Sequence, residues 1–170
     1  DMSYMFMDCS NLENANINTN SATNMEGLFS GCYNMITAPE LKTSKVTSMK
    51  NMFKGDISYK MKLKTVPLYD TTNVTDMYGM FLYNNQLETI PFFNTSNVTN
   101  MGGMFSDCSK LKTIPQIDTS KVTNMQSMFY QCTLLTEIPQ LDTSNVTDIQ
   151  SMFYLCYNLT EIPQLDTSNV

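Results

Sequence analysis

A single pattern of 24 residues recurs along the whole chain. The residues that open its successive copies are Asn18, Lys42, Asp70, Asn94, Asp118, Asp142 and Asp166. They lie 24 residues apart except between Lys42 and Asp70, where the step is 28 because four residues are inserted near residues 54–62. A fixed period in this range predicts a repeat solenoid, in which each copy forms one coil and packs on its neighbours. We therefore expect one array of about seven copies over residues 1–170.

Alignment of the copies predicts the core, because equivalent sites stack into ladders along a solenoid. Phenylalanine occupies one site in every copy: Phe6, Phe29, Phe53, Phe81, Phe105, Phe129 and Phe153. Two methionine ladders precede this site and account for twelve of the fifteen methionines. Flexible thioethers fill irregular gaps between apolar side chains, so we interpret these methionines as core residues rather than as a binding surface.

The same alignment suggests the local structure of each copy. Residues 135–138 combine apolar and β-branched side chains and precede Pro139, which is typical of a short strand that ends where the proline removes a donor. Residues 142–145, with the sequence Asp-Thr-Ser-Asn, predict a turn in which short polar side chains bind nearby backbone amides. Residues 146–153 fit either a short helical turn or an irregular bent strand.

The order Val-x-x-Met-x-x-Met-Phe-x-x-Cys-x-x-Leu-x-x-Ile-Pro, found from Val122 to Pro139, resembles the BspA-like, Treponema-type leucine-rich repeat. The lead-in Asp-Thr-Ser-Asn-Val-Thr resembles the variant found in mycoplasma lipoproteins and gut bacterial surface proteins. The resemblance covers essentially the whole chain. It implies a leucine-rich-repeat-like stack of short parallel strands with irregular or short helical connections. It also implies a secreted or surface-attached adhesive module without catalytic activity, of a kind also found in some phages and parasitic protists.

The amino-acid composition limits catalysis and the choice of partner. The chain has no histidine, arginine or tryptophan, which excludes histidine bases, histidine-bound zinc and arginine clamps on phosphate within this sequence. Its net charge is −6 with ten lysines, so we expect no nucleic-acid partner. No apolar run approaches the length of about 20 residues that a membrane span needs. Because both ends fall within a repeat, we expect a longer array with further segments outside it.

Two groups of carboxylates raise specific alternatives. Glu137 and Glu161 lie one copy apart, a spacing of about 5 Å that is similar to the pair in a retaining glycosidase. Asp118, Asp142 and Asp166 would stack in a row that could attract calcium. We interpret the first pair as surface decoration and the second group as ordinary turn residues, and we expect no enzyme activity, cofactor or metal.

All five cysteines fall on one ladder: Cys9, Cys32, Cys108, Cys132 and Cys156. Neighbouring copies would place their Cα atoms about 5 Å apart, which a disulfide tolerates. Parallel side chains, however, keep the sulfurs side by side, and an odd number leaves one cysteine unpaired. We therefore expect buried free thiols that act as small apolar spacers.

Departures from the repeat at exposed sites are the best guide to a binding surface. The position after each proline holds glutamine in late copies but Leu68 and Phe92 in earlier ones, and the next site holds Tyr69 and Phe93, which can replace a core leucine. The inserted segment and its flank add lysines and a tyrosine. We expect binding residues at Lys54, Tyr59, Lys60, Lys62, Lys64, Leu68 and Phe92.

Two functions from different classes follow from these features. One is an extracellular or cell-surface adhesion module that binds a protein or glycan on a host or neighbouring cell. The other is a structural or receptor-binding component of a phage particle or another extracellular assembly, which contacts other subunits. A glycosidase that uses Glu137 and Glu161 is a third alternative.

Overall fold

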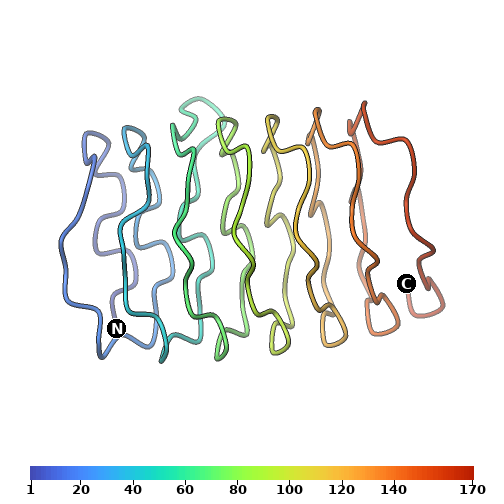
Figure 1. The fold of residues 1–170 in the computed structure, drawn as a ribbon, viewed down its shortest axis with the longest axis horizontal. Coiled ribbons are helices and arrows are strands. Elements are labelled where there is room, and N and C mark those ends of the chain that lie inside the picture. The colour runs from blue at the N-terminus through green and yellow to red at the C-terminus, as the bar shows by residue number, and fades with distance from the viewer.

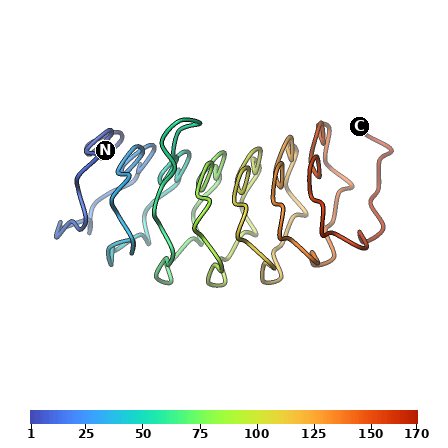
Figure 2. The ribbon, with the colours of Figure 1, turned by 90° about the horizontal axis from the view of Figure 1, so that it is seen from above.

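The computed structural model describes residues 1–170 as a row of stacked coils that follow one another in sequence order (Figures 1 and 2). The predicted repeat solenoid is confirmed. The chain has no regular helix, and its strands are reduced to isolated parallel β-bridges: Asn24–Ser48, Ser48–Asp76, Asp76–Asn100, Asn100–Asn124, Asn124–Asp148 and Thr37–Thr65. No segment forms a helix long and apolar enough to cross a bilayer.

Backbone hydrogen bonds between copies concentrate on one face, which carries the methionine and phenylalanine sites. We call it the bridge face (residues 24–31, 48–55, 76–83, 100–107, 124–131 and 148–155). The N–H groups of Met125, Ser127 and Phe129 donate to the carbonyls of Asp148, Gln150 and Met152 at 2.8, 2.8 and 3.0 Å. Met128 N–H instead closes a turn on the Met125 carbonyl, and Ser127 has a φ of 53°. Successive turns of this kind bend the chain without forming a helix. Of the two alternatives for residues 146–153, the irregular bent strand is therefore correct and the short helical turn is wrong.

The opposite face, the leucine face, comprises residues 63–69, 87–93, 111–117, 135–141 and 159–165. It has almost no backbone pairing, so the strand expected over residues 135–138 is not regular. A single backbone hydrogen bond, from Thr136 N–H to the Lys112 carbonyl at 3.0 Å, joins residues 135–141 to residues 111–117. The physical reason lies in the pattern, because apolar residues three apart do not alternate between two faces as a paired strand requires, and Pro139 lacks a donor.

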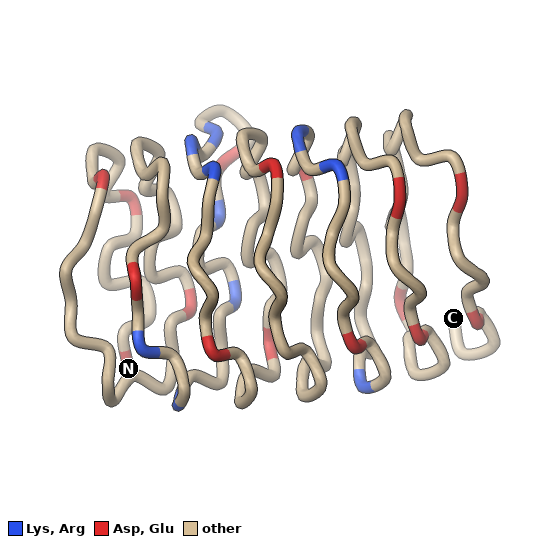
Figure 3. The backbone as a smooth tube through the Cα atoms, in the orientation of Figure 1, with Lys and Arg blue, Asp and Glu red and all other residues tan.

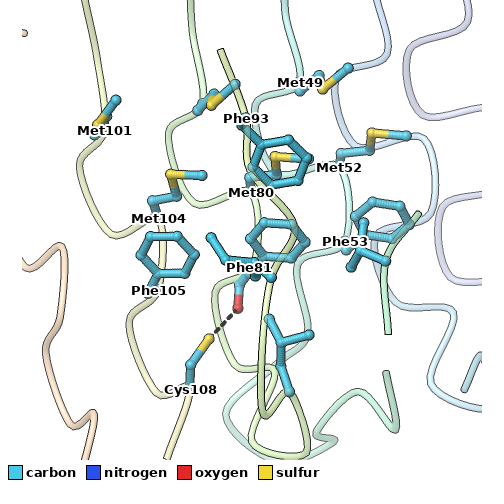
Figure 4. Close-up of a cluster of buried hydrophobic side chains, with 14 of the residues drawn as sticks. Met49, Met52, Phe53, Met80, Phe81, Phe93, Met101, Met104, Phe105 and Cys108 are labelled. Atoms are coloured by element: carbon cyan, nitrogen blue, oxygen red, sulfur yellow. Dashed lines mark hydrogen bonds between the residues drawn. The ribbon is translucent and has the colours of Figure 1, made fainter. Parts of the chain in front are cut away.

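The phenylalanine ladder forms a continuous stack through the core (Figure 4). Ring centroids of neighbouring copies lie 5.5–5.9 Å apart from Phe6 to Phe153. The five inner rings are fully buried, whereas Phe6 and Phe153 in the outer copies are half-buried. Tyr69 and Phe93 stack on this ladder from the leucine face and are also buried, so they occupy the core site that leucine or isoleucine holds in other copies.

The cysteine ladder supplies hydrogen-bond donors as well as small apolar spacers. All five thiols are free, and Cys32, Cys108 and Cys132 are buried. The expectation of burial is wrong for Cys9, which is exposed, and only partly right for Cys156, which is half-buried, because both lie in outer copies. The Cys108 Sγ–H donates to the Phe81 carbonyl of the preceding copy at 3.2 Å (Figure 4). The Cys132 Sγ–H likewise donates to the Phe105 carbonyl at 3.1 Å. Asn84 takes the place of cysteine in one copy, and its Nδ2 donates to the Phe53 carbonyl at 2.7 Å. Each of these donors ties its coil to the coil before it.

Burial should protect the inner thiols from alkylation, because the thiolate is the reactive form. Burial raises the pKa of Cys32 to about 12 and also raises the pKa of Cys108 and Cys132. At a pH of about 9, where an ordinary thiol is largely ionised, we expect iodoacetamide to label exposed Cys9 quickly and the inner thiols only after denaturation. Peptide mass mapping measures this order. Rapid native labelling of Cys108, or a Cys108–Cys132 disulfide, would contradict it.

Candidate binding surface

In four of the seven copies the turn that opens the repeat begins with an exposed aspartate at one edge of the solenoid: Asp70, Asp118, Asp142 and Asp166. Asp142 Oδ1 accepts the Ser144 N–H at 3.0 Å and the Ser144 hydroxyl at 2.6 Å. These two bonds lower the pKa of Asp142, with the hydroxyl contributing most, and the equivalent bonds lower the pKa of Asp118 and Asp166. The three aspartates are therefore charged, exposed and fixed in orientation at neutral pH.

A buried threonine ladder, which the sequence analysis treated only as part of the turns, links these turns together. Thr119 Oγ1 donates to the Asp142 carbonyl at 2.9 Å and accepts the Asp142 N–H at 2.8 Å. Thr143 makes the same two bonds to Asp166. The signal in the sequence was the recurrence of threonine at Thr19, Thr43, Thr71, Thr95, Thr119, Thr143 and Thr167. Asp118, Asp142 and Asp166 are thus each held in register by the preceding copy. The ladder is interrupted before Asp70, because Thr43 Oγ1 has no hydrogen-bond partner.

A groove runs along the solenoid between these turns and the ends of the leucine-face segments. Its three adjoining sections contain Leu68, Asp70 and Phe92, then Phe92, Gln116, Asp118, Gln140 and Asp142, then Gln140, Asp142, Gln164 and Asp166. The sections share lining residues, so we treat them as one continuous feature and call it the groove. Its middle section has a volume of about 630 Å³.

Leu68 and Phe92 form the apolar end of the groove. Their side chains are 69% and 60% exposed, and both line the same section. The adjoining Tyr69 and Phe93 already fill the core, so the fold does not need Leu68 and Phe92 for packing. The structure therefore brings together these two members of the predicted binding set.

The inserted loop lies at the other edge of the solenoid, at the top of Figure 1, away from the turns. Met61 is fully buried and anchors it. Lys60 Nζ lies 3.2 Å from Asp107 Oδ1 and 4.7 Å from the centre of the Tyr83 ring. Lys62 Nζ donates to Asn34 Oδ1 at 2.7 Å. Two of the predicted binding lysines thus hold the loop against the solenoid.

The exposed apolar surface of the loop consists of Ile57 and Tyr59, of which the sequence analysis missed Ile57. Ile57 is 71% exposed, and Tyr59 packs against Tyr33 with ring centroids 5.6 Å apart. Lys54 is half-buried and Lys64 is exposed. None of residues 54–64 lines the groove. The predicted set therefore divides between two separate surfaces, the loop and the apolar end of the groove.

Charge is distributed unevenly along the chain. Residues 1–112 contain nine lysines and ten carboxylates, whereas residues 113–170 contain one lysine and six carboxylates. Figure 3 shows red segments at the turns of the late copies and blue segments near the inserted loop. The late part of the groove is therefore acidic, and the loop edge is comparatively basic.

The carboxylates behind the two alternatives lie on the open surface. Glu137 and Glu161 are exposed, and no hydrogen bond or ion pair connects either side chain to another. No group of three or more histidine, cysteine, aspartate or glutamate side chains is arranged to hold a metal ion. The groove therefore offers a rigid surface with an apolar end and a row of hydrogen-bond acceptors.

Comparison with known proteins gives one family and two solved structures. The family model described as "Mycoplasma protein of unknown function, DUF285" matches residues 1–112 and 83–170. The chain is similar to a leucine-rich repeat protein of Treponema pallidum, with 17% identity and a TM-score of 0.46, over 82% of this chain and 72% of that one. A leucine-rich repeat protein from Bacteroides ovatus has 18% identity and a TM-score of 0.28, over 94% of this chain and 62% of that one. No curated protein sequence matches.

Proposed function

This chain belongs to the DUF285 family of mycoplasma proteins, which confirms the resemblance in its repeats, and we propose that it is a non-catalytic module that binds a protein partner through its solenoid surface. We further propose that it acts outside the cell, at a bacterial surface, in adhesion to a host or neighbouring cell. The mycoplasma family supports this location over the phage particle. The absence of histidine and arginine from the sequence supports a binding role over catalysis.

The observation that carries this proposal is the exposure of Leu68 and Phe92 in adjacent copies. Single exposed apolar residues are common on protein surfaces. These two, however, lie in one groove at a site that holds glutamine in three later copies, Gln116, Gln140 and Gln164. A pair of large apolar side chains rimmed by polar groups is typical of the centre of a binding surface.

The scaffold under this pair is rigid, which favours recognition. Backbone bonds join the bridge faces of successive copies, and the threonine ladder joins their turns. A surface held in this way loses little conformational entropy when a partner binds, so more of the contact energy appears as affinity. The loop pair Ile57 and Tyr59 is a second apolar surface on the same scaffold, and the experiment below compares the two.

Selection of random linear peptides on the immobilised chain tests this function without assuming a ligand. We expect peptides that bind the native chain and lose at least about tenfold in affinity when Leu68 and Phe92 are both changed to glutamine. Glutamine is a matched replacement because later copies hold it at this site. The I57S/Y59S variant, which removes the apolar side chains of the inserted loop and leaves the groove intact, is the control. No enrichment, or equal enrichment on L68Q/F92Q, would contradict a role for the groove.

A further inference from the structure

The groove presents hydrogen-bond acceptors to a ligand. Gln116 Nε2 is already occupied, since it donates to the Gln140 and Ile117 carbonyls at 3.0 and 3.1 Å. Ser120 and Ser144 give their hydroxyl protons to Asp118 and Asp142 Oδ1. The glutamine Oε1 atoms and aspartate Oδ2 atoms receive no hydrogen bond from the chain. A ligand that satisfies this surface must therefore be rich in donors.

The carboxylates of the groove form no ion pair within the chain. Lys121 is the single lysine of residues 113–170, and its Nζ donates to Asn97 Oδ1 at 2.7 Å. Its charge also helps to lower the pKa of Asp118, after the hydrogen bonds from Ser120, but the two side chains form no ion pair. The two salt bridges of the molecule, Lys50–Glu26 and Lys60–Asp107, involve no groove residue. Asp118, Asp142 and Asp166 therefore form a row of like charges, which a cationic ligand would neutralise.

The spacing of the copies indicates the conformation and direction of such a ligand in the groove. Phenylalanine centroids of the copies beneath the groove lie 5.8–5.9 Å apart. In an extended polypeptide, side chains on one side repeat about every 6.6 Å. Long, flexible lysine side chains can absorb this small difference. An extended chain along the solenoid axis would thus offer one side chain to each copy.

The two ends of the groove require different side chains. Leu68 and Phe92 line the end nearer the N-terminus together with one carboxylate, Asp70, and the acidic row lines the other end. A small polyamine would leave the apolar end uncovered, and a neutral glycan would leave the charges without partners.

We propose that the groove binds an extended, basic polypeptide segment, with apolar side chains over Leu68 and Phe92 and lysine or arginine side chains over Asp118, Asp142 and Asp166. This inference rests on the proposed function and names the chemistry of its partner. The charge complementarity of the late copies and the apolar pair of the early copies together select this class of ligand.

A synthetic peptide with the order Leu-Ser-Leu-Ser-Lys-Ser-Lys-Ser-Lys, together with its reversed sequence, tests the inference by fluorescence anisotropy. We expect one of the two directions to bind at least about tenfold more tightly than the same peptide with glutamate in place of lysine. Raising the salt from about 0.01 M to about 0.15 M shortens the Debye length from about 30 Å to about 8 Å and should weaken binding about fivefold or more.

Matched variants separate a local effect from a change in net charge. D118N/D142N should weaken binding about fivefold or more, and the turns should persist because Asn94 makes the same bonds at the equivalent site. D76N/D148N removes the same charge from the bridge face, where Asn100 and Asn124 occupy equivalent sites, and should leave binding unchanged. Equal weakening by both variants would overturn the inference.

The remaining outcomes distinguish the inference from the function on which it rests. If selected peptides depend on Leu68 and Phe92 but show no basic residues, the inference fails and the binding function stands. If no peptide depends on these residues, both fail. Binding of neutral glycans on an array, without binding of the lysine peptide, would assign the groove to carbohydrate and overturn the inference. Binding of the lysine peptide that is insensitive to salt would also overturn it.

Discussion

Replacement of Phe105 with alanine is expected to lower the free energy of unfolding by about 3–5 kcal/mol. Phe105 is fully buried, and its ring stacks between Phe81 and Phe129 at centroid distances of 5.9 and 5.8 Å. Truncation removes apolar surface from both neighbouring coils and leaves a cavity that the rigid backbone bonds keep open. No copy can bury its own apolar face alone, so the damage should spread to both neighbours.

Chemical denaturation of the purified chain, followed by circular dichroism, measures this loss. Phe153→Ala is the matched control, because Phe153 lies in the outer copy, is only half-buried and stacks on one ring of its ladder. We expect it to cost less than half as much as Phe105→Ala. A Phe105→Ala variant that loses less than about 1 kcal/mol would contradict the role of the ladder as the core of the fold.

Replacement of Thr119 with valine is expected to cost about 2–4 kcal/mol, although the two side chains have nearly the same shape. The hydroxyl is buried and serves both the carbonyl and the N–H of Asp142. Valine would remove this partner from two part-buried backbone groups, and each lost hydrogen bond costs about 1–2 kcal/mol. The effect is large because one atom connects two copies by two bonds.

Thr123→Val provides the control within the same copy. Thr123 is exposed, and its hydroxyl donates to the Thr99 carbonyl at 3.2 Å. The Thr123 N–H donates to the same carbonyl at 2.9 Å, so the carbonyl keeps a partner when the hydroxyl is removed. Its loss should change stability by less than about 0.5 kcal/mol. Equal effects of the two substitutions would show that the buried threonine ladder has no special role.

The solenoid could be predicted from the sequence because every core site recurs with the period of the coil. The face that carries the backbone pairing could not be predicted in the same way. Residues 135–138 have the composition of a strand yet remain almost unpaired, whereas the paired segments contain turns with positive φ at Ser127 and Ser151. The equivalent site in earlier copies holds residues that favour a left-handed conformation, Gly27, Asn51, Gly79 and Gly103. Local preference therefore supports the turn in those copies, and the packing of neighbouring copies maintains it at Ser127 and Ser151.

The proposed binding surface could be predicted from the sequence only where a residue departs from its own ladder. Leu68 and Phe92 stand out against the glutamines of later copies, and the structure places both in one groove. The lysines of the inserted loop gave no such signal about their partners. Lys60 pairs with a residue 47 positions away, and Lys62 with one 28 positions away, so these contacts depend on the stacking of the coils.

Chemical-shift mapping of the chain with the lysine peptide tests the central claim, that the groove is the binding surface, most directly. A chain of 19.3 kDa is suited to amide spectra. The account predicts that the largest shifts occur at Leu68, Phe92, Gln116, Asp118 and Asp142, with little change over residues 54–62 or across the bridge face. Shifts centred on the inserted loop, with the groove unchanged, would contradict it.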